Sequence, residues 1–219
     1  MRLGILTGLA FEAELLRPLP PDVIVVCAGM GPARAAQGTS RLIDRGATHL
    51  LSFGIAAALE ERLKAGTVVV STKLGETPCD PAWVAATAQG LSCLAGAFVD
   101  AGGILDSPTA KVALRSQTGA IAADMESCAM ARAAGQRPCI AVRAISDEVD
   151  QSLPRAAVAG VDEMGRVRIG SVLKELVRGP GQIGDLIRLA RSTARARHAL
   201  ARSARLGLPH RFFVDVGDE

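Results

Sequence analysis

The feature that most restricts how this chain can fold is the regular alternation of short apolar segments with helical segments. The apolar segments are rich in Val, Ile, Leu and Ala, and they fall at residues 2–8, 22–29, 48–59, 66–73, 120–124 and 139–147. Helical patterns separate them at residues 10–19, 30–46, 81–96, 108–119 and 125–135. Apolar strands that alternate with helices are typical of a largely parallel sheet covered on both faces. The sequence therefore predicts an α/β fold with three layers, α/β/α, around a central, mostly parallel (mixed) sheet.

The length suits one such domain. The chain has 219 residues, of which 49% are hydrophobic, and this is enough for one compact domain with a full core. Because no repeat, low-complexity tract or boundary is evident, we expect residues 1–219 to form a single domain. The segment from Leu153 onward is expected to be mostly helical, with a break at residues 179–181 and a basic helix at about 183–208.

Composition argues against several classes of protein. Aromatic residues make up 3% of the chain, with no Tyr and one Trp, so the stacking platform of a single-stranded nucleic-acid binder is missing. The net charge of +3 does not imply a polyanionic partner. The five cysteines form no CxxC pair and the three histidines show no ligand spacing, so we expect reduced thiols, no metal and no cofactor. Neither a signal peptide nor an apolar run of about 18 residues is present, and we expect a cytoplasmic protein.

Acidic residues follow several of the predicted strands. In α/β sheets, sites form where strands end and helices begin, which directs attention to Glu12, to Asp124 and Glu126, and to Ser146 and Asp147. Helix capping explains Asp124 as well as a chemical role does. Capping suits Glu126 less well, because the helix after it has few polar residues.

The last of these strands ends in "SDEVD", residues 146–150, which could also be a solvated acidic loop. Arg143 within the strand argues against that alternative, because a buried arginine needs a partner.

Four segments in collinear order resemble one known family. "RLGILTGLAFEAELL", "VVCAGMGPARAA", "LLSFGIAAALEERLKAGTVVV" and the pair "ADMESCAMA" and "VRAISDEVD" are similar to the motifs of the superfamily of purine nucleoside phosphorylases and methylthioadenosine/adenosylhomocysteine nucleosidases. The resemblance runs from Met1 to about Val177. It implies a nucleoside phosphorylase-like fold and an enzyme that cleaves the N-glycosidic bond of a purine riboside.

The resemblance assigns roles to residues of this chain. Glu126 would bind the ribose hydroxyls with Met125 against the sugar, and a fixed carboxylate there would stabilise the oxocarbenium character of the transition state. Asp147 would be the general acid at the purine, oriented by Ser146, with burial beside other carboxylates keeping it protonated. Asp124 would then be a cap. The remaining substrate contacts would come from Gly54, Ile55 and Ala56.

Hydrolysis and phosphorolysis are both open at this point. Glu12 stands where nucleosidases of the family have a water-activating base and phosphorolytic relatives have an arginine, and Ser52 stands in place of a second phosphate-binding arginine. These residues favour water. Phosphate as a co-substrate stays open, because Gly8, Gly29 and Gly31 offer backbone donors to an anion.

The segments expected to contact the base, together with the C-terminal tail, resemble one branch of the family. "GIAAA" at residues 54–58 and "LDSPTAKV" at 105–112 depart from the nucleosidase pattern, and the chain looks most like the hopanoid-associated phosphorylases, which are linked to removal of adenine from adenosylhopane. We expect a homodimer that takes a small purine riboside, in this branch a lipid-linked one. A methylthioadenosine/adenosylhomocysteine nucleosidase is the alternative within the family, and a non-catalytic nucleoside or lipid binding protein is the alternative outside it.

Two further patterns carry weaker signals. "GMGPAR" at residues 29–34 lacks the third glycine of a dinucleotide fingerprint, which argues against a nicotinamide-dependent oxidoreductase. The helix at 183–208 is either an ordinary surface helix or a peripheral contact with the inner membrane through its arginines. Binding of nucleic acid is the least favoured of the three roles, because the arginines have no aromatic residues among them. Its apolar stripe is expected at Leu186, Leu189, Ala190, Thr193 and Ala194.

Overall fold

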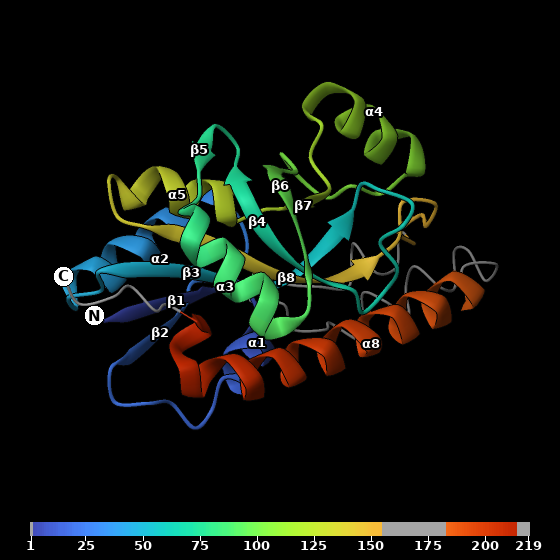
Figure 1. Ribbon diagram of the computed structural model, residues 1–219. Coiled ribbons are helices and arrows are strands. Elements are labelled where there is room, and N and C mark those ends of the chain that lie inside the picture. The colour runs from blue at the N-terminus through green and yellow to red at the C-terminus, as the bar shows by residue number, and fades with distance from the viewer. Residues whose placement is uncertain (1, 155–182, 214–219) are drawn as a thin grey trace.

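The computed structural model describes residues 2–154 and 183–213, and strands and helices alternate along it as the sequence predicts (Figure 1). The strands are β1 (Leu3–Thr7), β2 (Val23–Cys27), β3 (His49–Ala58), β4 (Val68–Leu74), β5 (Thr77–Pro78), β6 (Leu94–Asp100), β7 (Ala122–Asp124) and β8 (Cys139–Asp147). The helices are α1 (Ala10–Leu15), α2 (Pro32–Asp44), α3 (Pro81–Leu91), α4 (Pro108–Thr118), α5 (Ser127–Ala134) and α8 (Ile183–Gly207), followed by the 3-10 helix η2 (Leu208–Phe213).

The strands form one mixed sheet, as predicted. β2, β1 and β3 are parallel neighbours, and β8 is parallel to β3. The pairs β4–β6 and β6–β7 are also parallel, whereas β3–β7, β4–β8 and β4–β5 are antiparallel. Because β8 pairs with both β3 and β4, the strands β3, β7, β6, β4 and β8 close into a ring, from which β1 and β2 extend. This closure is a feature that the sequence does not predict.

Helices cover the sheet in two groups. α2 and α5 pack against each other, and α8 runs along β8 with α1 and α3 beside it (Figure 1). The larger of two buried apolar clusters in the described residues includes residues from Leu3 in β1 to Phe212 in η2. Within the described residues, no helix combines the length and the apolar character that a membrane span requires.

The structure corrects two expectations about individual elements. Residues 81–96 are not one helix, since α3 ends at Leu91, Ser92 is left-handed with φ 49°, and Leu94 begins β6 opposite Val69. A short apolar run such as residues 93–96 fits either a strand or a helix, and pairing with β4 decides the outcome.

In α8 the buried stripe differs from the expected one. Ala190 and Ala194 are exposed, and the buried positions are Ser192, Ala196, Leu200, Ser203 and Ala204. Small side chains at this spacing let the helix lie close to β8. The expected helical segment and break within residues 155–182 lie outside the described residues.

Candidate active site

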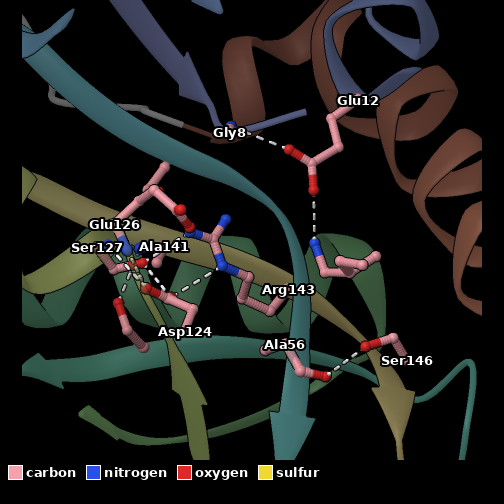
Figure 2. A network of polar contacts seen from close by, with 12 residues as sticks. Gly8, Glu12, Ala56, Asp124, Glu126, Ser127, Ala141, Arg143 and Ser146 are labelled. Carbon is pink, nitrogen blue, oxygen red and sulfur yellow. Dashed lines mark hydrogen bonds and ion pairs between the residues drawn. The ribbon is translucent and has the colours of Figure 1, made fainter. Parts of the chain in front are cut away.

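The ends of four strands bring most of the expected residues together. β1 leads through Gly8 to α1 with Glu12, β7 ends at Asp124, and β8 ends at Asp147, while β3 supplies the backbone between them. Figure 2 shows Gly8, Glu12, Asp124 and Glu126 around Arg143 of β8. Strand ends thus place three acidic side chains around one buried guanidinium.

Glu12 is held by backbone donors on both of its carboxylate oxygens. Oε2 accepts hydrogen bonds from the N–H groups of Gly8, at 3.0 Å, and Leu9, at 2.9 Å. Oε1 accepts from Ile55 N–H at 3.0 Å, and the side chain is 3% exposed. Burial raises the pKa of Glu12, against the opposing effect of Arg143 and of these hydrogen bonds. Any side chain at Gly54 would collide with the Glu12 carboxylate, which explains the glycine there.

Glu126 faces the same space from the start of α5. Its Oε1 accepts a hydrogen bond from Gly31 N–H at 2.9 Å, across 95 residues of sequence. A Cβ added at Gly8 would lie 3.2 Å from the Glu126 carboxyl carbon, so this glycine leaves room for the carboxylate. Burial, followed by the negative charge of Asp124, raises the pKa of Glu126 to about 7. Met125 beside it is half-buried.

Asp124 lies two residues before Glu126, the N-cap residue of α5, and binds both the start of that helix and the buried Arg143. Its Oδ1 accepts hydrogen bonds from Glu126 N–H, at 2.9 Å, and Ser127 N–H, at 2.7 Å. Its Oδ2 accepts from Ser127 Oγ and, at 2.9 Å, from Arg143 Nε. Burial favours the neutral acid, but Arg143 and the hydrogen bonds outweigh burial and lower the pKa of Asp124. Asp124 therefore anchors the junction between β7 and α5.

Arg143 links the acidic groups to β3. Its Nη2 donates to Ser52 Oγ at 2.7 Å and to Ser127 Oγ at 2.9 Å. Its Nη1 is buried and has no hydrogen-bond partner among residues 2–154 and 183–213. Burial opposes the positive charge, but Asp124, Glu12 and Glu126 outweigh it and raise the pKa of Arg143. Arg143 thus joins Asp124, Ser52 and Ser127 beneath the two glutamates.

Asp147 lies at the end of β8 in a separate set of contacts. Ser146 Oγ donates to Asp147 Oδ1 at 2.8 Å and lies 3.2 Å from the carbonyl oxygen of Ala56. The Lys111 ammonium of α4 lies 2.7 Å from Asp147 Oδ2. We expected Asp147 to be buried beside other carboxylates. That expectation is wrong, because its closest charged neighbour is the cation Lys111.

Two of the three backbone donors that we considered for phosphate already have carboxylate partners. Gly8 N–H donates to Glu12, and Gly31 N–H donates to Glu126. Gly29 and Gly31 have φ values of 89° and 99°, which only glycine adopts readily, so both are needed for the turn before α2. A phosphate ion at Gly8 or Gly31 would have to displace a carboxylate.

The model of the phosphorylase superfamily matches residues 20–178, which is most of the chain. The chain belongs to the phosphorylase superfamily. The resemblance found in the sequence is thereby confirmed at the level of the superfamily, and the hopanoid-associated branch stays a prediction.

Individual relatives in the phosphorylase superfamily are distant. A 5'-methylthioadenosine/S-adenosylhomocysteine nucleosidase of Haemophilus ducreyi is 25% identical over 201 residues, covering 69% of this chain and 87% of that protein. The structure of such a nucleosidase from S. pneumoniae with a transition-state inhibitor matches with a TM-score of 0.67 and 19% identity, covering 94% of this chain and 99% of that one. The futalosine hydrolase of Helicobacter pylori matches with a TM-score of 0.66 and 17% identity, covering 94% and 97%. At these identities the solved structures show the fold alone.

The sequence analysis did not identify three residues of the site. Lys111, in the "LDSPTAKV" segment, contacts Asp147. The available signal was its place near the start of a helix, where the helix dipole disfavours a cation. Ser52 was noted only as the replacement of an arginine, and in the structure it accepts a hydrogen bond from Arg143. Ser127 had no signal beyond its place at the start of a helix. No group of three metal-ligating side chains occurs in the described parts of the chain.

Proposed function

We propose that the protein cleaves the N-glycosidic bond of a purine riboside, with water as the acceptor of the sugar. The observation that supports water most directly is Glu12, a carboxylate fixed by Gly8, Leu9 and Ile55. Burial raises its pKa, as a general base that takes a proton from water near neutral pH requires. A fixed negative charge would also repel phosphate at this position.

Glu126 and Met125 form the sugar side of the proposed site. The Glu126 carboxylate stands near Gly8 and shares its surroundings with Arg143 and Glu12. A carboxylate that accepts hydrogen bonds from the ribose hydroxyls stabilises positive charge as it develops on the sugar.

Asp147 gives a proton to the purine as it departs. Ser146 donates a hydrogen bond to one oxygen of Asp147. Gly54, Ile55 and Ala56 belong to β3, the strand that pairs with β8. The Asp147→Asn variant is expected to lose at least about a hundredfold in rate, because general acids contribute on that order. Phosphorolysis, with phosphate as a co-substrate, is the less favoured version of the same reaction, since Gly8 and Gly31 donate to carboxylates.

For the substrate we propose adenosylhopane, which would yield adenine and ribosylhopane. Support comes from the altered "GIAAA" and "LDSPTAKV" segments and from a helix α8 whose arginines face solvent and could meet anionic lipid at the inner membrane. A methylthioadenosine/adenosylhomocysteine nucleosidase is the alternative, supported by the activity in the name of the Haemophilus ducreyi relative. A homodimer in the cytoplasm completes the proposal.

Release of adenine from adenosine, methylthioadenosine and adenosylhopane, each with and without phosphate, tests this assignment. We expect release without phosphate and fastest turnover of adenosylhopane. Fastest turnover of methylthioadenosine would favour the alternative substrate. Tight binding of these nucleosides with no release would instead indicate a non-catalytic binding protein.

A further inference from the structure

Lys111 is a fully buried lysine beside Asp147, the proposed acid. It lies in the first turn of α4, behind the cap formed by Ser107 and the following Pro108, and it is 0% exposed. A buried ammonium is costly unless it is paired and hydrogen-bonded. Its partners therefore have to account for its position.

Lys111 Nζ makes two hydrogen bonds and one ion-pair contact. Nζ donates to the carbonyl oxygen of Glu148, at 2.7 Å, and to that of Gln151, at 2.9 Å. The third contact is with Asp147 Oδ2, also at 2.7 Å. All three acceptors belong to the end of β8 and the loop after it, so Lys111 ties α4 to the segment that bears the proposed acid.

The two carboxylate oxygens of Asp147 differ in their surroundings. Oδ2 is the oxygen beside Lys111. Its contact with Nζ has the distance of an ion pair but not the alignment of a hydrogen bond, and no other described residue donates to this buried oxygen. Oδ1, in contrast, accepts from Ser146 Oγ at 2.8 Å. Oδ2 is thus held against Lys111 and closed to a ligand, so a ligand would meet Asp147 at Oδ1.

A purely structural role for Lys111 explains less of this arrangement. A cation in the first turn opposes the helix dipole, so the position does not stabilise α4. The two carbonyl oxygens of Glu148 and Gln151 could be satisfied by a neutral donor, which would not need to bury a charge. The charge of Lys111 is explained only by Asp147.

Other charged groups near the pair are engaged elsewhere. The Glu148 carboxylate turns toward solvent, where Oε2 lies 3.0 Å from Lys64 Nζ and Oε1 accepts from Ala65 N–H. Asp150 is exposed. Lys111 is therefore the cation that acts on Asp147 in the described part of the chain.

We propose that Lys111 is the positioning residue for Asp147, an inference that rests on the proposed cleavage. As the bond between sugar and purine breaks, its electron pair stays on the purine, whose ring nitrogen takes a proton from the Asp147 carboxyl group. Lys111 keeps its three protons and holds that carboxyl group in place. The oxygen of water bonds to the sugar carbon and its proton goes to Glu12. Exchange with solvent then returns one proton from Glu12 to Asp147, so no further reactant is needed.

A comparison of two leaving groups tests this role. Adenine needs a proton to depart, whereas the 4-nitrophenolate of 4-nitrophenyl β-ribofuranoside does not. Lys111→Met should lower kcat for adenosine by roughly a hundredfold or more with KM within about threefold, and change turnover of the nitrophenyl riboside by no more than about threefold. Lys64→Met, at a lysine whose side chain is 62% exposed, is the matched control and should leave both rates unchanged.

Equal losses on both substrates, or an adenosine rate above about a tenth of wild type, would overturn the role of Lys111 while the proposed function stands. If the wild-type protein releases no purine from any riboside, the function and the inference fall together. Should Lys111→Met fold poorly, the Lys111→Met/Asp147→Asn double variant removes both charges. Its adenosine rate should equal that of Asp147→Asn alone, and a further loss of about tenfold would contradict a role of Lys111 that acts through Asp147.

Discussion

Glu126 holds its proton more tightly in the folded protein than an ordinary glutamate does. Its pKa rises from 4.5 to about 7, first because of burial and then because Asp124 is negative. The folded state therefore prefers the protonated acid. This preference stabilises the protein fully below pH 4.5, and the benefit is lost as the pH rises through about 7.

Glu126→Gln should therefore stabilise the protein at high pH and inactivate it. The amide cannot ionise, so the variant avoids the cost of a buried charge. The shift from 4.5 to about 7 corresponds to about 3 kcal/mol at about 1.36 kcal/mol per pH unit. We expect the free energy of unfolding of the variant to exceed that of wild type by up to this amount at pH 8, and by much less at pH 4.

Urea unfolding at pH 8 and pH 4 measures this difference in stability. Adenosine cleavage by the same samples tests the proposed role of Glu126 in binding the ribose. A pH-independent difference between variant and wild type would mean that Glu126 titrates normally. Full activity of Glu126→Gln would remove the carboxylate from the proposed site.

Among the elements, the junction between β7 and α5 depends on one ion pair. Asp124 receives the N–H groups that begin α5 and the Nε of Arg143 from β8, so it joins a strand, a helix and a second strand. Both side chains of the pair are 2% exposed. Breaking such a pair leaves an uncompensated buried charge.

Asp124→Ala is accordingly expected to lower the free energy of unfolding by about 3–5 kcal/mol. Glu76→Ala is the control, because Glu76 forms its ion pair with Lys73 on the surface, where its side chain is 98% exposed. That change should cost less than about 1 kcal/mol. Equal effects of the two substitutions in thermal or urea unfolding would show that the Asp124–Arg143 pair does not stabilise the junction.

Helix α8 offers a test of the lipid contact. Its arginines at 188, 191, 195, 197, 202 and 205 are exposed, while Ala196, Leu200 and Ala204 pack inward. If these arginines meet anionic lipid, the protein should sediment with anionic vesicles at low salt. It should be released as salt shortens the Debye length to about 8 Å at physiological ionic strength.

Replacing Arg195, Arg197, Arg202 and Arg205 by Gln should abolish sedimentation and leave cleavage of dissolved adenosine intact. Vesicles of neutral lipid should not retain the wild type, because the attraction is electrostatic. Failure to bind anionic vesicles at low salt would make α8 an ordinary surface helix, and the lipid-linked substrate would lose its support from the fold.

For the molecule as a whole, periodicity along the chain was enough to predict the alternating elements and the mixed sheet. The binding of Asp124 to the start of α5 and the need of Arg143 for a partner also followed from local chemistry. The closed ring of strands did not, because β8 pairs with β3 and β4 over long sequence separations that no local pattern records. The same holds for Lys111 and Asp147, which lie on different elements and meet only through the fold.

The proposed reaction type, hydrolysis, rests on the way the fold surrounds Glu12, and labelled water tests it most directly. The protein is incubated with adenosine and phosphate in H₂¹⁸O, and the sugar product is analysed by mass spectrometry. We predict free ribose that carries ¹⁸O, at a rate that phosphate does not raise and that Glu12→Gln lowers by roughly a hundredfold or more. Formation of ribose 1-phosphate, or a rate that rises with phosphate, would contradict the hydrolytic role of Glu12.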